Sequence, residues 1–251
     1  MNRKSVFLTS QYGQKLNGTK NSHIKFVLEN NISFSPYEDI TLQIQNVVLP
    51  ISSYLINENN DLLVFNGTPY LLQHGNYSVT DLITEIQGEI PNLTITFNRK
   101  TNKFLFSYNA SFTINSSSTI LGILGLSSQD HNSVSNAVES DDVIDLSGNN
   151  MFYIGVEEIQ TNNILQSKVS SIIGSIPVDS NYGDILVSSY QIPSRVYINS
   201  LSILTIFILD ENLNYVNFQN KEWNITLLFE SQVNIDNFNK YLYLQNIISP
   251  P

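Results

Sequence analysis

The segment Gly75–Leu126, GNYSVTDLITEIQGEIPNLTITFNRKTNKFLFSYNASFTINSSSTILGILGL, carries the most closely spaced folding signals in the chain. Ser78 is placed to cap a helix, and Asp81 stands at the capping-box position three residues later. Gly88 and Pro91 then end this helix, whose apolar residues fall on one face. Two to three turns is shorter than the roughly 12–15 residues at which an isolated helix becomes marginally stable. We therefore expect the helix to pack against a sheet.

Two segments of alternating residues follow the predicted helix. Leu93–Phe97 and Lys103–Tyr108 place apolar or aromatic residues at every second position, which is typical of strands with one buried face. The polar run Asn98–Asn102 between them is typical of a turn. The sequence therefore predicts a hairpin with one face on the helix, followed by a last short turn at Ile120–Leu124. Helix and hairpin would form a small lobe at about residues 66–130, inserted in a larger domain.

Composition limits what that larger domain can be. The chain has 251 residues, which allow one large domain or two small ones, and it has no cysteine, so disulfides, thiolate metal sites and cysteine nucleophiles are excluded. The net charge is −10 with only 14% charged residues, which argues against direct nucleic-acid binding by clustered basic residues. No stretch approaches 18 apolar residues, and the first ten residues lack the apolar region of a secretory signal. We expect no membrane-spanning segment and synthesis inside a cell without secretion by the ordinary route.

Short candidate strands, separated by Asn, Gly and Pro about every ten residues, run through the rest of the chain. The clearest is Ile40–Val48, where apolar residues alternate with Thr and Gln. The others are Ser22–Glu29, Ser53–Ile56, Leu62–Phe65, Thr68–Gln73, Met151–Ile159, Val169–Pro177, Ile185–Tyr190, Val196–Leu209, Tyr215–Phe218 and Trp223–Glu230. Such spacing favours an all-β fold, an antiparallel sandwich or barrel.

The end of the chain contains the strongest predicted hairpin. Leu201–Leu209 is followed by a turn at Asp210–Asn212 and then by Tyr215–Phe218, and Trp223–Glu230 continues the run. At the other end, Met1–Lys20 reads as an arm or an edge strand. Ser231–Pro251 reads as a C-terminal tail, polar at first and then aromatic.

Metal sites have little support in the sequence. The three histidines, His23, His74 and His131, lie far apart, and none has a second histidine or a carboxylate at metal-ligand spacing. The acidic loop at residues 139–145 could hold a hard cation, but acidic loops are usually only solvated. We predict no metal-binding residues.

One partial calcium motif is better explained as a turn. Asp210, Asn212 and Asn214 match the first three ligand positions of an EF-hand loop. The match fails beyond them, because Tyr215 stands at the glycine position and Lys221 at the position of the bidentate glutamate.

Signatures of catalysis or cofactor binding do not occur either. Gly122 and Gly125 are too closely spaced for a dinucleotide fingerprint, and no G-x-S-x-G, P-loop or H-E-x-x-H sequence is present. Trp223 could form a sugar-binding platform, but it begins a strongly apolar strand and is better explained as core. We predict no catalytic residue, no cofactor and no enzymatic activity.

The order of six blocks resembles the penton (minor capsid) proteins of virophages and of the related Maverick/Polinton-type DNA viruses. The blocks are GNYSVTDLITEIQGEI, TFNRKTNKFLF, STILGILGL, LSGNNMFYIGVEEI, IIGSIPV and SLSILTIFILDENLNYVNFQNKEWNITLLFE, between Gly75 and Glu230. The resemblance implies a single jelly roll, residues 1–230, that carries the lobe as an insertion. It also implies a homopentamer at the five-fold vertices of an icosahedral capsid, in contact with a separate double-jelly-roll major capsid protein.

Further expectations depend on this resemblance. The protein would be located in the virion, and the N-terminal arm and the aromatic tail from Phe238 to Tyr243 would reach neighbouring capsid subunits. One alternative is a jelly-roll attachment or glycan-binding module, fibre-like or lectin-like, on a viral particle. Another is a carbohydrate-active β-sandwich enzyme, which would require two carboxylates about 5–10 Å apart in a groove.

Overall fold

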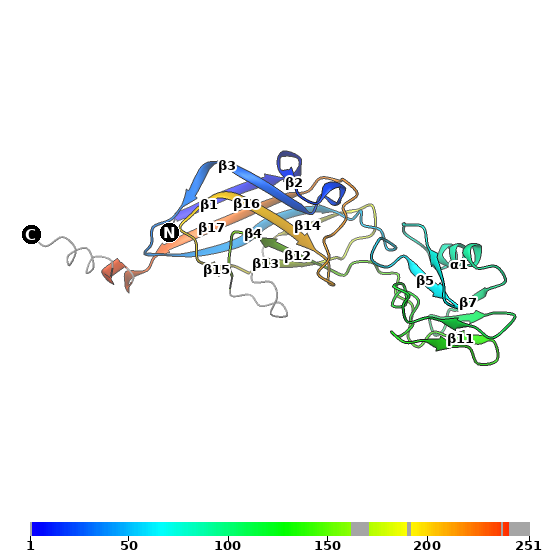
Figure 1. The fold of residues 1–251 in the computed structure, drawn as a ribbon. Coiled ribbons are helices and arrows are strands. Elements are labelled where there is room, and N and C mark those ends of the chain that lie inside the picture. The colour runs from blue at the N-terminus through cyan, green and yellow to red at the C-terminus, as the bar shows by residue number, and fades with distance from the viewer. Residues whose placement is uncertain (1, 162–170, 190–191, 237, 241–251) are drawn as a thin grey trace, which may run out of the picture. The chain divides into compact units, whose positions relative to one another are not determined.

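The computed structural model describes residues 2–161, 171–189, 192–236 and 238–240, and it divides the chain into two compact units (Figure 1). The first unit comprises Met1–Ser53 and Asn149–Pro251, and the second is Tyr54–Gly148. Val169, Tyr190, Tyr241 and Tyr243, which the sequence analysis placed in strands or in the tail, lie outside the described residues.

The first unit is a sandwich of two antiparallel sheets. The β4 sheet has the order β1 (Asn2–Thr9), β17 (Asn224–Val233), β4 (Glu38–Pro50) and β14 (Ile185–Ser189), and β15 (Ser194–Val196) also pairs with β4. The β16 sheet has the order β13 (Ile172–Pro177), β12 (Met151–Val156), β16 (Ser200–Leu209), β3 (His23–Ser33) and β2 (Gln14–Lys15). These antiparallel sheets confirm the predicted all-β sandwich.

A single apolar core lies between these two sheets. The predicted alternation in Ile40–Val48 is confirmed, because Ile40, Leu42 and Ile44 are buried in this core. Trp223 is fully buried, and its indole Nε1 donates to the carbonyl of Asn21 at 2.6 Å. A buried indole N–H needs such an acceptor, so this bond allows the largest core side chain to be enclosed.

The ends of the sandwich agree with the expectations in part. The N-terminal segment is an edge strand, because β1 pairs with β17 along its whole length, from Asn2 opposite Ser231 to Thr9 opposite Asn224. The tail therefore begins beyond Val233, and residues 231–233 belong to the sheet.

The predicted C-terminal hairpin is only partly correct. Tyr215 forms an isolated bridge with Leu209 across the predicted turn, but Tyr215–Phe218 does not form the predicted strand. The segment predicted at Trp223–Glu230 becomes β17, which pairs with β1 and β4 in the sheet opposite β16. The predicted strand at Ser53–Ile56 is likewise reduced to one bridge, between Ile56 and Gly75.

The second unit packs one helix, α1 (Val79–Glu89), with two small sheets on a core of its own. One sheet has the order β10 (His131–Asn132), β9 (Thr113–Ile114), β5 (Leu62–Phe65) and β6 (Thr68–Leu71). The other has the order β11 (Ala137–Glu139), β8 (Lys103–Ser107) and β7 (Thr94–Asn98). The predicted β7–β8 hairpin is confirmed.

The helix begins as predicted and ends later than its glycine suggested. The Ser78 side chain accepts from the Asp81 N–H while the Asp81 side chain accepts from the Ser78 N–H, so the capping box is confirmed. The helix passes through Gly88 and ends at Glu89, before Pro91. Leu82 and Ile86 are fully buried, as a helix of this length requires.

This second unit is wider than the lobe expected at residues 66–130. It begins at Tyr54 because β5 pairs with both β6 and β9. It ends at Gly148 because β10 and β11, which lie beyond residue 130, belong to its two sheets.

Gly125 and Gly122 lie in one turn and provide a matched test of this packing. Gly125 has φ +68°, and a Cβ there would collide with the carbonyl oxygen of Asp142, whereas a Cβ on Gly122 would meet nothing within 4 Å. Gly125→Ala should destabilise the second unit by about 1–3 kcal/mol through backbone strain and overpacking, and Gly122→Ala should stay near the parent. Calorimetric unfolding of both variants would check this, and equal transitions would contradict it.

Candidate assembly surface

Each histidine lies beside a carboxylate that the sequence did not reveal. His23 Nε2 is 2.8 Å from Glu157 Oε1, and its ring stacks on Tyr215 with centroids 5.0 Å apart. His74 Nε2 is 2.8 Å from Asp61 Oδ2. Among the described residues, however, no three His, Cys, Asp or Glu side chains come together as a metal site would require.

His131 is buried in β10 and contacts the neighbouring loop of the second unit. Its Nε2 lies 2.9 Å from the carbonyl of Ser127 and 3.8 Å from Asp141 Oδ2. Asp141 itself accepts from the Ser127 hydroxyl at 2.6 Å and from the Ser127 N–H at 3.0 Å. These hydrogen bonds hold the pKa of the Asp141 carboxyl below its ordinary value.

Carboxylates of the acidic segment at residues 139–145 thus form hydrogen bonds that hold neighbouring loops in place. Asp145 accepts from the N–H of Ser147 at 2.9 Å, and the Lys103 ammonium donates to the Asp141 carbonyl. Carboxylates already engaged by local donors in this way are poor candidates for gathering around a cation.

The partial calcium motif is a turn, as the sequence analysis predicted. Asp210 Oδ1 accepts from the N–H of Asn212 at 2.9 Å and from that of Asn214 at 2.8 Å. Burial raises the pKa of Asp210 above its ordinary value despite these hydrogen bonds. The carboxylate therefore shapes the connection between Leu209 and Tyr215.

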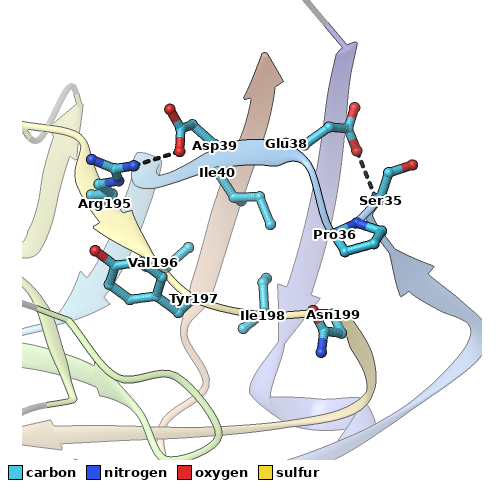
Figure 2. Close-up of a pocket in the computed structure, with 10 residues that line it drawn as sticks. All are labelled: Ser35, Pro36, Glu38, Asp39, Ile40, Arg195, Val196, Tyr197, Ile198 and Asn199. Carbon is cyan, nitrogen blue, oxygen red and sulfur yellow. Dashed lines mark hydrogen bonds and ion pairs between the residues drawn. The ribbon is translucent and has the colours of Figure 1, made fainter. Parts of the chain in front are cut away.

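A hollow of about 240 Å³ opens in the first unit between residues 35–40 and 195–199 (Figure 2). It contains two adjacent acids, Glu38 and Asp39, which point toward different partners in the close-up. Glu38 accepts from the Ser35 N–H at 2.8 Å and from the Ser231 hydroxyl at 3.0 Å. Asp39 forms an ion pair with Arg195.

This hollow does not present a catalytic pair of acids. Asp39 also accepts from the Asn234 amide at 2.8 Å, so both of its oxygens are occupied, as are both oxygens of Glu38. Tyr197 is 66% exposed, and its ring centroid lies 5.8 Å from the Arg195 guanidinium carbon. The residues hold the start of β4 against β15 and the end of β17, which is a structural role.

The most exposed apolar side chains of the first unit lie on its strands and on the segments beside them. They include Phe7 on β1, Val27 on β3, Ile185 and Val187 on β14, Ile192 and Tyr197. Sequence periodicity marked most of these strands, but it did not show which of their outward-facing side chains would stay exposed. Apolar side chains exposed on strands are candidates for contact between chains. The tail also keeps one aromatic contact inside the unit, because Phe238 packs edge-on against Tyr37 with centroids 5.2 Å apart.

No helix among the described residues has the length and apolar character needed to cross a lipid bilayer. The described residues form an antiparallel sandwich with a separately folded unit inserted after β4, and the candidate functional features that they present are surfaces.

Comparison with known proteins identifies this architecture. No protein-family model and no curated protein sequence matches the chain. Among solved structures the chain is similar to the mavirus penton protein, with 9% sequence identity, 92% of this chain and 100% of that chain covered, and a TM-score of 0.53. It is also similar to a chain in the cryo-EM structure of the Sputnik virophage, with 10% identity, coverage of 91% and 98%, and a TM-score of 0.48.

The chain thus has the fold of a virophage penton protein, as the resemblance in its sequence blocks implied. Only 8% of this chain lies outside the match to the mavirus protein, so the match extends into both units. The jelly-roll class of the sandwich is confirmed by this likeness.

Asp141 provides a test of the loop network through pH. Its folded pKa is depressed below the ordinary value of 3.8, so its contribution to stability is present above pH 3.8 and is lost as the pH falls through the folded pKa. Asp141→Asn should lower stability by up to about 1 kcal/mol at pH 7, because the carboxylate is partly exposed. The difference should shrink below pH 3.8.

Calorimetry between pH 7 and pH 3 would measure this difference. Asp142→Asn, at the exposed neighbouring position, is the matched control and should follow the parent. A deficit of Asp141→Asn that stayed constant into acid would show that the carboxylate charge plays no part.

Proposed function

We propose that this protein is a structural component of an icosahedral viral capsid, a penton or minor capsid protein. It forms a homopentamer at the five-fold vertices and contacts a separate double-jelly-roll major capsid protein. The observation that carries the proposal is the fold shared with the whole of the mavirus penton protein. The proposed location is the capsid vertex of the virion, after synthesis inside the host cell.

Closure of a ring gives the proposed assembly its physical basis. Five identical copies meet through two different surfaces on each copy, and such a head-to-tail contact closes when the rotation between neighbours divides the circle. The exposed apolar side chains on the strands of the first unit provide surface for this contact. The second unit has its own core, so we propose that it is displayed as an insertion and leaves assembly to the sandwich.

The proposal includes no enzymatic activity, no cofactor and no direct contact with nucleic acid. We propose no enzymatic activity because the two acids of the hollow are engaged by backbone and side-chain partners. We propose no contact with nucleic acid because the net charge of −10 disfavours binding to phosphates.

The mass of the purified protein in solution tests the assembly directly. Light scattering behind a sizing column should give five times the 28.3 kDa of one chain, over a range of protein and salt concentrations. A trimer would instead favour an attachment or glycan-binding module. A monomer at all concentrations would contradict pentamer formation by the isolated protein.

The proposed role of the tail has its own test. Truncation after Lys240 keeps β17 and the contact between Phe238 and Tyr37, so the sandwich should unfold at the same temperature as the parent when both are compared as dissociated chains. If the aromatic residues beyond it reach neighbouring subunits, the truncated protein should associate more weakly in the same scattering experiment. Unchanged assembly would rule the tail out as an intersubunit contact.

A further inference from the structure

β14 is an edge strand that lacks the usual protection. Among the described residues it pairs with β4 alone, in a regular register from Ile185 opposite Pro50 to Ser189 opposite Asn46. Its sequence, ILVSS, contains no charge and no proline. Ile185 and Val187 are 65% and 63% exposed. Natural sheets guard their edges with charges, prolines, bulges or very short strands, so an unguarded apolar edge indicates a partner.

The other edge strands described in this unit carry such guards. β1 contains Arg3 and Lys4, β13 ends at Pro177, β15 contains Arg195, and β2 is two residues long. Among the edge strands described in this unit, β14 is therefore the one without a charge, a proline or a very short length.

Among the described residues, one row of backbone hydrogen-bonding groups on β14 faces no other strand. The carbonyl of Asp184 accepts from the Ile51 N–H at 3.0 Å, and in an antiparallel ladder such bonded positions recur at every second residue. Leu186 and Ser188 therefore bond to β4. The N–H and C=O groups of Ile185, Val187 and Ser189 point to the free edge.

β1, at the opposite edge of the same sheet, has a matching row. The Ser10 N–H donates to the Trp223 carbonyl at 3.0 Å, so the bonded positions of β1 are the even-numbered ones. The odd-numbered residues Arg3, Ser5, Phe7 and Thr9 direct their backbone groups away from β17. Phe7 is 79% exposed.

Strand directions make these two edges compatible. The order β1, β17, β4, β14 contains four strands that alternate in direction, so β14 runs opposite to β1. When copies are arranged head to tail in a ring, β14 of one copy therefore meets β1 of the next as an antiparallel neighbour.

We propose that β14 of each copy pairs with β1 of the adjacent copy, so that the β4 sheet continues from one subunit into the next. This inference rests on the proposed pentamer and specifies its interface. Arg3, which is paired with Glu230, and Lys4 disfavour only those registers of β1 with a second β1 in which these side chains lie opposite one another.

One register satisfies both the backbone and the side chains. Ile185–Ser189 lies opposite Ser5–Thr9, which brings Val187 opposite Phe7 on the outer face. On the inner face it brings Leu186 opposite Leu8, two residues that already face the core. Aromatic and β-branched side chains directly opposite each other are a favourable cross-strand pair.

The absence of cysteine permits a direct test by crosslinking. The double variant Phe7→Cys with Val187→Cys should form disulfides between copies on oxidation, because opposing residues of an antiparallel pair have Cα atoms within the range a disulfide spans. A denaturing, non-reducing gel should show a ladder that stops at five chains. Each single variant should remain uncrosslinked. Val187→Cys with Val27→Cys, whose second cysteine is equally exposed on β3, is the matched control and should give no ladder.

A second comparison avoids thiols. Val187→Lys should weaken association at least about tenfold, because the charge guards the edge. Val187→Thr keeps the β-branched shape without charge and should assemble like the parent. Position 187 is exposed, so the thermal transition of each variant should match that of the parent when all are measured at a concentration at which the parent is dissociated.

The outcomes separate this inference from the proposed function. The β14–β1 contact would be overturned, and the pentamer would remain, if the parent is a pentamer but the double-cysteine variant gives no ladder. The same conclusion would follow if Val187→Lys associates as strongly as the parent. Dimers from Val187→Cys alone would overturn it in favour of β14 pairing with itself. A parent that stays monomeric, without a ladder, would overturn both. A ladder that continues beyond five chains would keep the strand contact and remove the five-fold closure.

Discussion

The hydrogen bond from the Asn149 amide to the Ser53 hydroxyl, 3.0 Å long, joins the two points where the chain leaves and re-enters the sandwich. Because these points lie together, the sandwich can close its core as if the residues between them were absent. The inserted residues can then fold around a core of their own, with their own helix and sheets. One chain thus holds two cores, and each stays close to the size at which a small domain is stable.

Local signals predicted the elements well and their partners poorly. The capping box at Ser78 and the alternation in β4 were predictable because every residue involved lies within a few positions in the sequence. The position of β17 was not, because its partners β1 and β4 lie at the other end of the chain. Periodicity shows which face of a strand is buried, but it does not show which strand lies beside it. β10 and β11 were missed for a different reason, since they are too short for any period to show.

The same distinction explains what could be foreseen about function. Burial of Trp223 followed from its apolar strand, and the turn at Asp210 followed from adjacent residues. The hydrogen bond between His23 and Glu157 joins β3 to the residue that follows β12, and it could be found only from the fold. Ile185–Val187 is a continuous apolar run, which in sequence is typical of a fully buried strand. Only the sheet order shows that this strand is an edge, and only then does its lack of charge become informative.

Net charge connects the edge to the proposed assembly. Each copy carries −10, so bringing copies together costs electrostatic energy wherever acidic surfaces approach within a Debye length, about 8–10 Å. A contact made by backbone hydrogen bonds and uncharged side chains adds no further charge repulsion, and it satisfies N–H and C=O groups that are otherwise left to water. Its selectivity comes from strand direction and register. An uncharged strand at one edge and an oppositely directed strand at the other therefore suit the proposed contact between copies, which has to form in one orientation despite their like charge.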